Sequence, residues 1–571
     1  MRHVKFFTWF GTICLALTIT GCANRLDSVN ARIWNSVEQP TSFPEVEGPL
    51  AVPWLKDKSS FGIAFSGGGT RSATATLGQL RALNELGWLD EVKYISAVSG
   101  GSWTSVPYTY LPEEYSDQVF FGKYTPPSEL SEGKIKKTTK GSMADAIQDI
   151  GYVSFRFLGN ALVGLGDESF SQTISEEYLA PFDLDDREKF FSFHEAAIDN
   201  IIAENTKNKS SKYYMKKRDF YQVKDDRPYL LVGGSLIYPR NGDTSSIYPF
   251  EMTPLYTGVR NNFTAKGKDI GGGYVESFAY DSKRSIKPLR SDGLRQEFRL
   301  GSERHRFTLA DMVGTSGAAP QQTLLKFKLK AIGFPEFKHW PITEGEKVRG
   351  IEIPHGDGGH IDNIGLMPLL VRKVDNILVF VNTPVRFNVE ANIDNLSKKD
   401  FEDDLVSYFK YVKDKDYNEV IDNGQQKFKE LHSAFTVQKS EQNAGPLVHC
   451  DTYDIKDQSR YGISAYKPNI CWVYLDKTEK WLQQVKQNPK MSKTYKLIDK
   501  DKKEFKNFPH FATFAQEWKE AQLIDLERPA VNVLSNLTAW TVFEKKEYLA
   551  KNLGIKSNGK KSNVTAEINK L

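Results

Sequence analysis

The sequence predicts an α/β fold in which a mostly parallel central sheet is covered by helices. Two short hydrophobic runs, Phe61–Phe65 and Val92–Val98, have the length and composition of buried strands. Each run ends in a turn that contains glycines, and each turn leads into a stretch compatible with a helix. A third run, Ile377–Pro384 (ILVFVNTP), has the pattern of a further buried strand. Strands that alternate with helices are typical of a parallel sheet, because each connection must cross over a face of the sheet.

The composition is that of a globular protein with a large core. The chain has 571 residues, of which 40% are hydrophobic and 12% aromatic, and no internal repeat or long low-complexity linker divides it. Although this length would allow three or four domains, we expect one catalytic core at residues 56–385 and a C-terminal extension, 386–571, that packs on it. The formal net charge is +4, which becomes +2 without Arg2 and Lys5. Such a balance argues against a general nucleic-acid-binding protein.

The N-terminus has the pattern of an export signal. Basic residues precede the hydrophobic stretch Phe6–Ile19, which is short for a membrane-spanning helix. The stretch leads into ITGC, which resembles the lipobox of bacterial lipoproteins. Residues 1–21 are therefore predicted to be a lipoprotein signal peptide, with Cys22 as the lipidated residue and 22–55 as a polar tether marked by prolines. The alternative is an ordinary secretory signal with a chance cysteine.

The predicted anchor would hold the protein in the cell envelope. Each buried acyl methylene contributes ~0.8 kcal/mol, so several acyl chains would bind a membrane surface firmly. Ala23, and not an aspartate, follows the cysteine. By resemblance to known sorting patterns, that residue favours the outer membrane of a Gram-negative bacterium.

Ser99 lies at the corner between the second strand-like run and the helix-compatible run after it, in AVSGGSW. A serine on a sharp strand-to-helix turn has the geometry of a nucleophile elbow, in which the hydroxyl stands clear of the backbone. The earlier turn, SGGGTR at Ser66–Arg71, contains glycines whose amides can stabilise the oxyanion of acyl transfer. We predict that Gly68 and Gly69 form the oxyanion hole and that Arg71 holds an anionic group such as a phosphate.

The two glycine turns resemble those of the cytosolic phospholipase A2 family, within the wider group of patatin-like lipases. Four later segments match that family in order: YPFEMTPLYTGVR at Tyr248–Arg260, GGGYVESFAY at Gly271–Tyr280, TLADMVGTSGAAP at Thr308–Pro320 and FPHFATF at Phe508–Phe514. The resemblance extends from about residue 56 to beyond residue 514. It implies a patatin-like hydrolase fold with helical insertions and a C-terminal extension.

The same resemblance implies a catalytic dyad. In that family the serine pairs with an aspartate in a later D-G-G or D-S-G turn, and no histidine is needed. Asp357, which is followed by Gly358 and Gly359, matches this position. The implied dyad is therefore Ser99 and Asp357. One position departs from the family pattern, because Ala97 stands where many relatives have a glycine two residues before the serine.

Other interpretations of these motifs remain. His355 and His360 flank the aspartate, so a Ser-His-Asp triad is an alternative, and Asp357 could also be an ordinary turn residue. A metal site is disfavoured, because no further cluster of His or Cys accompanies the histidines. Ser316 could be mistaken for the nucleophile, but no β-branched strand precedes it. The small residues around it would instead let a helix approach Ser99. The glycine loop lacks the Gly-Lys-Ser/Thr of a phosphate-binding P-loop, and we expect no cofactor.

A long insertion, residues 111–186, follows the elbow. Lys134, Lys136, Lys137 and Lys140 form a basic cluster directly before the hydrophobic run Met143–Leu165. One interpretation is a mobile lid or a surface that contacts lipid, with the lysines near anionic head groups. The alternative is a buried helix beside a solvated run of charges.

Two cysteines remain once the signal peptide and the lipidated cysteine are set aside. In an exported protein Cys450 and Cys471 can form a disulfide. Two buried free thiols are the alternative.

The predicted function is hydrolysis of a fatty-acyl ester in a phospholipid or lysophospholipid. An acyltransferase would use the same residues and pass the acyl group to another hydroxyl. A non-catalytic envelope lipoprotein that keeps the fold for binding is the third possibility.

Overall fold

The computed structural model describes residues 29–37, 40–48, 50–147, 169–206, 215–288, 295–299, 306–326, 333–339, 341–342, 350–397, 399–410, 412, 418–512 and 526–555. The predicted signal peptide, Cys22 and the first part of the tether lie outside these residues. Most of the hydrophobic run of the insertion, residues 148–165, also lies outside them.

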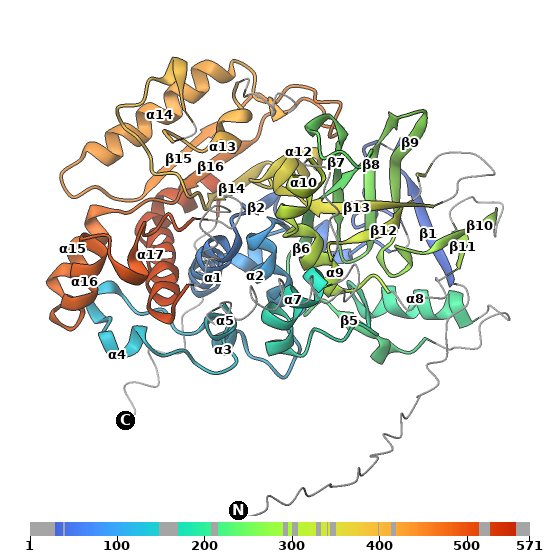
Figure 1. Cartoon of the computed structure of the whole chain (residues 1–571), viewed down its shortest axis with the longest axis horizontal. Helices are drawn as coiled ribbons and strands as arrows, with labels where there is room; N and C mark the ends of the chain where they lie inside the picture. The colour runs from blue at the N-terminus through green and yellow to red at the C-terminus, as the bar shows by residue number, and fades with distance from the viewer. Residues whose placement is uncertain are drawn as a thin grey trace, which may run out of the picture.

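One large sheet runs through the described part of the molecule, with helices on both sides of it (Figure 1). Twelve of its fourteen strands follow one path, in the order β10 (Lys283–Pro288), β11 (Arg295–Arg299), β1 (Val29–Asn35), β9 (Lys268–Glu276), β8 (Tyr256–Ala265), β7 (Ile247–Met252), β6 (Tyr229–Ile237), β3 (Tyr94–Val98), β2 (Phe61–Phe65), β14 (Asn376–Val381), β16 (Asn469–Tyr474) and β15 (Leu447–Thr452). Off this path, β13 (Ile351–Asp357) pairs with β6 and with β12 (Glu336–His339). The short strands β4 (Phe190–Ser192) and β5 (Phe220–Gln222) pair separately.

The α/β prediction is confirmed, and the sheet is mixed. Five adjacent strands, β6, β3, β2, β14 and β16, run parallel to their neighbours in the centre. Strands β2 and β3 are buried at every residue, as is usual where helices cover both faces of a parallel sheet. The flanking pairs from β6 through β7, β8 and β9 to β1 are antiparallel. Short loops join β7, β8 and β9, and such loops permit only antiparallel neighbours.

Helices cover the sheet (Figure 1). They are α1 (Gly69–Glu85), α2 (Gly100–Thr109), α3 (Asp117–Phe121), α4 (Glu132–Ile135), α5 (Met143–Ile147), α7 (Ser169–Tyr178), α8 (Glu195–Thr206), α9 (Leu309–Ser316), α10 (Ala319–Lys326), α11 (Gly359–Asp362), α12 (Met367–Val371), α13 (Asp403–Ser407), α14 (Gly424–Ser440), α15 (Glu479–Gln487), α16 (Ser492–Asp499) and α17 (Arg528–Leu553). None of the helices in these described ranges is both long and hydrophobic enough to cross a membrane.

Helix α1 is buried along most of its length against the late helix α17. Gly78 makes this close approach possible, because a Cβ built there would lie 2.1 Å from the carbonyl oxygen of Ser535. The hydroxyl of Thr538 donates a hydrogen bond to the carbonyl of Ala75 at 3.0 Å. The end of the chain therefore packs directly on the helix that follows the glycine loop.

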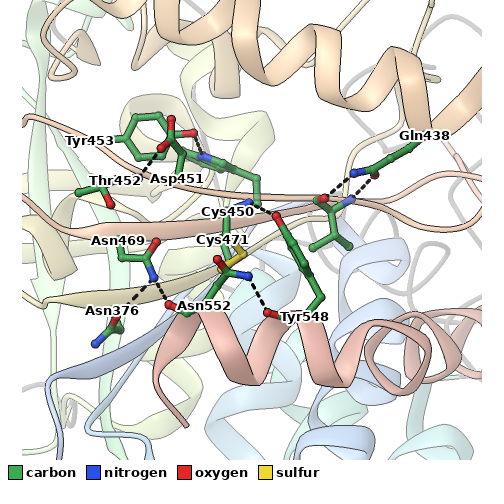
Figure 2. Close-up of a disulfide and its surroundings, with 12 residues drawn as sticks. Asn376, Gln438, Cys450, Asp451, Thr452, Tyr453, Asn469, Cys471, Tyr548 and Asn552 are labelled. Carbon is green, nitrogen blue, oxygen red and sulfur yellow. Dashed lines mark hydrogen bonds between the residues drawn. A yellow bond between two sulfur atoms is a disulfide. The ribbon is translucent and has the colours of Figure 1, made fainter.

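The C-terminal residues also extend the central sheet. Strand β16 pairs in parallel with β14, and β15 closes that edge in antiparallel pairing. At the free edge of β15, the side chain of Gln438 in α14 accepts the N–H of Val448 and donates to its carbonyl (Figure 2). Residues before and after position 386 thus share one sheet.

Cys450 and Cys471, the two cysteines paired in the sequence analysis, form a disulfide between directly opposed positions of β15 and β16 (Figure 2). The N–H of Cys450 donates to the hydroxyl of Tyr548 at 3.1 Å, so α17 lies beside the bridge. Cys471 is fully buried. The disulfide thus fastens the edge strand to the core of the sheet.

Removal of this disulfide should destabilise the protein. The bridge closes a loop with a sequence separation of 21 residues, for which the loss of chain entropy in the unfolded state predicts about 3 kcal/mol. We expect the Cys450→Ala/Cys471→Ala double variant to unfold at a lower urea concentration than the oxidised wild type. An unchanged midpoint would show that the bridge contributes nothing.

The described part of the insertion divides into a basic and a buried portion. Lys134, Lys136, Lys137 and Lys140 are exposed, whereas Met143–Ile147 forms α5 and buries all but one of its side chains in the core. The first turn of the hydrophobic run therefore belongs to the core. Contact of the insertion with lipid stays a prediction.

Candidate active site

Ser99 occupies a strained turn between β3 and α2. Its backbone has φ 50° and ψ −128°, a conformation that is costly for a residue other than glycine. Its N–H donates to the hydroxyl of Ser316 at 2.9 Å, and its carbonyl accepts from the hydroxyl of Ser102 at 2.6 Å. These bonds hold the turn, so the side chain of Ser99 is free to point away from the backbone.

Asp357 is the last residue of β13, and strand β6 brings it to the serine. The end of β3 pairs with the first half of β6, so that Val98 lies opposite Gly233. Strand β13 runs in the opposite direction beside the second half of β6, so that Asp357 lies opposite Gly234. Two strands therefore end at adjacent positions of a third strand, and the residues at their ends meet.

The hydroxyl of Ser99 donates to Oδ2 of Asp357 at 2.9 Å. Oδ1 of the same carboxylate accepts the N–H of Gly359 at 2.6 Å, which fixes the orientation of the carboxylate. Ser99 is 7% exposed and Asp357 is 3% exposed. Burial raises the pKa of Asp357 to about 7, although the bonds from Gly359 and Ser99 lower it. The carboxylate is thus a much stronger base than a solvated aspartate.

The glycine loop lies directly against the elbow. A Cβ built on Gly67 would lie 3.0 Å from Cβ of Ser99, and a Cβ built on Gly100 would lie 1.9 Å from the carbonyl oxygen of Gly69. Gly68 and Gly69 have φ values of 137° and 54°, which favour glycine. Across the described residues, neither of their amides donates to a backbone or side-chain acceptor. Both amides lie at the N-terminus of α1, which favours negative charge.

Arg71 lies beneath this loop. Its guanidinium donates to the carbonyl of Asn382 at 3.0 Å and to the carbonyl of Phe511. The side chain is only 1% exposed, and burial lowers the pKa of Arg71 to about 10. As placed here, Arg71 joins the glycine loop to the end of β14 and to the late segment around Phe511. The predicted contact of Arg71 with a lipid phosphate stays a prediction.

Neither histidine beside Asp357 is hydrogen-bonded to Ser99 or to the carboxylate of Asp357. His355 is fully buried, where its Nε2 shares a 2.7 Å hydrogen bond with the hydroxyl of Tyr280 and its Nδ1 one of 2.7 Å with the carbonyl of Ile353. Burial lowers the pKa of His355 to about 3, so the ring stays neutral. His360 lies on α11, and no hydrogen bond joins it to Ser99 or Asp357, both of which the structure describes. The arrangement fits a two-residue centre.

Sequence reasoning missed two contributors to this geometry. The hydroxyl of Ser316 accepts the N–H of Ser99 at 2.9 Å and donates to the carbonyl of Gly233 at 2.7 Å, a role that the sequence did not indicate. At Gly233 a Cβ would lie 3.0 Å from Cγ2 of Val98, a tight contact, and at Gly358 a Cβ would lie 2.5 Å from the carbonyl oxygen of Gly233, so the two backbones approach closely here. The pair of glycines within the β6 sequence was the available signal, since glycine inside a strand indicates a close approach of backbones.

Comparison with known proteins gives partial similarities. No protein-family model matches the chain. Human cytosolic phospholipase A2 beta is 38% identical over 82 residues, which is 14% of this chain and 10% of that protein. Mouse cytosolic phospholipase A2 zeta is 60% identical over 38 residues (7% and 4%), and human cytosolic phospholipase A2 delta is 44% identical over 61 residues (11% and 7%). The matched segments thus span a tenth or less of these relatives.

Among solved structures, human GIVD cytosolic phospholipase A2 aligns with 93% of this chain and 66% of its own, at 13% identity and a TM-score of 0.41. A second structure of that protein, in complex with methyl gamma-linolenyl fluorophosphonate, aligns with 88% of this chain and 60% of its own at a TM-score of 0.36. The chain therefore spans less than two thirds of the length of both.

Proposed function

We propose that the protein is a serine acyl hydrolase that cleaves fatty-acyl esters of phospholipids or lysophospholipids. The observation that carries this proposal is the 2.9 Å hydrogen bond from the hydroxyl of Ser99 to a buried Asp357, beside the amides of Gly68 and Gly69, which donate to no acceptor among the described residues. The short stretches shared with cytosolic phospholipases A2 support the class of substrate.

In the proposed mechanism Asp357 takes the proton from Ser99 while Oγ attacks the ester carbonyl. The amides of Gly68 and Gly69 stabilise the oxyanion, a contribution whose loss typically costs about 3–4 kcal/mol of barrier per donor. The intermediate collapses to a seryl ester as the bond to the leaving oxygen breaks. That oxygen takes the proton from Asp357 and departs as the alcohol of a lysophospholipid or of a glycerophosphodiester. A water molecule then gives a proton to the same carboxylate and attacks the seryl ester, and the fatty acid leaves as Oγ of Ser99 takes that proton from Asp357.

The test is mass spectrometry of the products from a mixed set of phospholipids and lysophospholipids. We expect free fatty acid and a deacylated lipid from the wild type and neither from Ser99→Ala. The reaction is repeated with an acceptor alcohol. Acyl transfer in preference to hydrolysis would make the protein an acyltransferase, and no product under either condition would make it a non-catalytic binder.

The activity should fall as the pH drops below about 7. Because burial raises the pKa of Asp357 to about 7, the carboxylate is protonated below that pH and cannot accept the proton of Ser99. We therefore expect kcat/KM on a soluble ester to lose about tenfold per pH unit below 7. The residual activity of Asp357→Asn serves as the control and should stay flat. An acid limb near pH 4 would contradict the raised pKa.

We further propose that the mature protein is a lipoprotein of the cell envelope, in the outer membrane of a Gram-negative bacterium, anchored through Cys22. The motif ITGC supports this proposal. Cells that express the full chain and receive a palmitate analogue should label the wild type and leave Cys22→Ser unlabelled. Equal labelling of both proteins would contradict it.

A further inference from the structure

A short segment of the C-terminal half, α13 and the residue after it, holds the helix that follows Asp357. Oδ2 of Asp404 accepts the side-chain amide of Asn363 at 3.0 Å. The hydroxyl of Tyr408 donates to the buried Asp362, which also accepts the N–H groups of Gly365 and Met367. Two successive residues after the catalytic turn are thus fixed from one element far along the chain.

Asn363 connects this segment to both parts of the site. Its main-chain carbonyl accepts the N–H of Gly67 at 2.7 Å, which binds the glycine loop. Its side-chain oxygen lies against both glycine turns, because a Cβ on Gly67 would lie 2.1 Å from it and a Cβ on Gly359 would lie 2.6 Å from it. The orientation of this side chain therefore sets the spacing between the glycine loop and the Asp357 turn.

Asp404 is itself firmly placed. It is 7% exposed, and its N–H donates to Glu402, whose carboxylate accepts the hydroxyl of Thr383 at 2.6 Å, just after β14. Its carbonyl accepts the hydroxyl of Ser407 at 2.7 Å. The central strand next to the glycine loop thus supports the carboxylate that orients Asn363.

We propose that Asp404 is a positioning residue of the active site: it orients Asn363 between the glycine loop and the Asp357 turn, and it brings a negative charge to within one side chain, that of Asn363, of this turn. The proposal rests on the proposed hydrolase function for its kinetic consequences. Through the first role Asp404 sets the geometry of attack, and through the second it strengthens the general base.

The charges around Asp357 agree with the second role. Asp404 is the charged group whose proximity raises the pKa of Asp357, in addition to burial. Asp362, on α11, is engaged by Tyr408 and two backbone amides. His355, on the same strand, stays neutral, and His360 is on α11. Arg71 lies beneath the glycine loop, and the charge of Glu402 favours the protonated form of its guanidinium.

Three variants separate the two roles in kinetics. Asp404→Asn keeps an oxygen that can accept from Asn363 and removes only the charge, so the acid limb of kcat/KM should move to lower pH, and kcat at pH 8 should fall less than in Asp404→Ala. Asp404→Ala removes both the charge and the oxygen that accepts from Asn363, so it should lower kcat about tenfold or more with little change in KM. Asn363→Ala should cause a similar loss, and Asp404→Ala should add little to it, because the two residues act as a unit.

Asp422→Asn is the matched control, because it removes an exposed carboxylate from the same half of the chain and should leave the profile unchanged. Additive losses for Asp404→Ala and Asn363→Ala, or an acid limb that does not move in Asp404→Asn, would overturn the proposal.

A measurement without substrate tests the charge role even if the protein hydrolyses no ester. Because the folded-state pKa of Asp357 lies above its unfolded value, its protonated form stabilises the fold at low pH, and this contribution is lost as the pH rises to about 7. The difference in unfolding midpoint between wild type and Asp357→Asn, followed from pH 4 to 9, therefore reports that pKa. When both proteins also carry Asp404→Asn, the plot of this difference against pH should reach its plateau at a lower pH. A curve that does not move refutes the charge role, whereas absent esterase activity refutes only the hydrolase proposal.

Discussion

Ser99→Ala and Asp357→Asn should each remove nearly all esterase activity, with a fall in kcat of about 10⁴-fold or more. The serine hydroxyl is a poor nucleophile at neutral pH and depends on an adjacent base. In this site the only side chain bonded to that hydroxyl, among the described residues, is Asp357. In the proposed mechanism the two groups act in one proton transfer, so the double variant should be no less active than either single variant.

The measurement is kcat on a soluble acyl ester together with a thermal melt of each variant. His360→Ala is the matched control, because it changes a side chain three residues after Asp357 that makes no hydrogen bond to the dyad. It should retain most of the activity. If His360→Ala, or a folded His355 variant, proved as damaging as Asp357→Asn, a triad would replace the dyad.

Gly100→Ala should be the most damaging change that leaves both reacting groups in place. A Cβ at this position would lie 1.9 Å from the carbonyl oxygen and 2.8 Å from the nitrogen of Gly69. Backbone atoms cannot yield as a flexible side chain can, so the glycine loop must move away from Ser99. We expect kcat to fall by about 10²–10³-fold, the usual cost of a lost oxyanion donor, and the melting temperature to drop as well.

Gly133→Ala provides the control for this substitution. Gly133 lies in α4, a Cβ built there meets nothing within 4 Å, and its backbone is not left-handed. This change should leave kcat unaltered and the stability equal or slightly higher. A Gly100→Ala variant with wild-type kcat would show that the glycine loop does not hold the oxyanion.

The local elements of the site could be predicted because their signals are local. A hydrophobic run followed by Ser99 and two glycines indicates a strand, a turn and a helix whatever the rest of the chain does. The glycine loop before α1 carries the same kind of signal. The pairing of Ser99 with Asp357 came from a resemblance, since no local pattern relates positions 258 residues apart. The antiparallel flank of the sheet was not expected, because the strand order depends on which edges remain free after the centre has formed.

The sequence by itself determined the elbow, the glycine loop and the two cysteines of the disulfide. The tertiary structure decided how close the hydroxyl of Ser99 and the carboxylate of Asp357 lie and how deeply they are buried, because both properties arise only when distant segments pack together. Strand β6 aligns the ends of β3 and β13 at Gly233 and Gly234, which brings the hydroxyl and the carboxylate to 2.9 Å. The surrounding core then removes water from Asp357, and that desolvation raises the pKa of its carboxyl group to about 7.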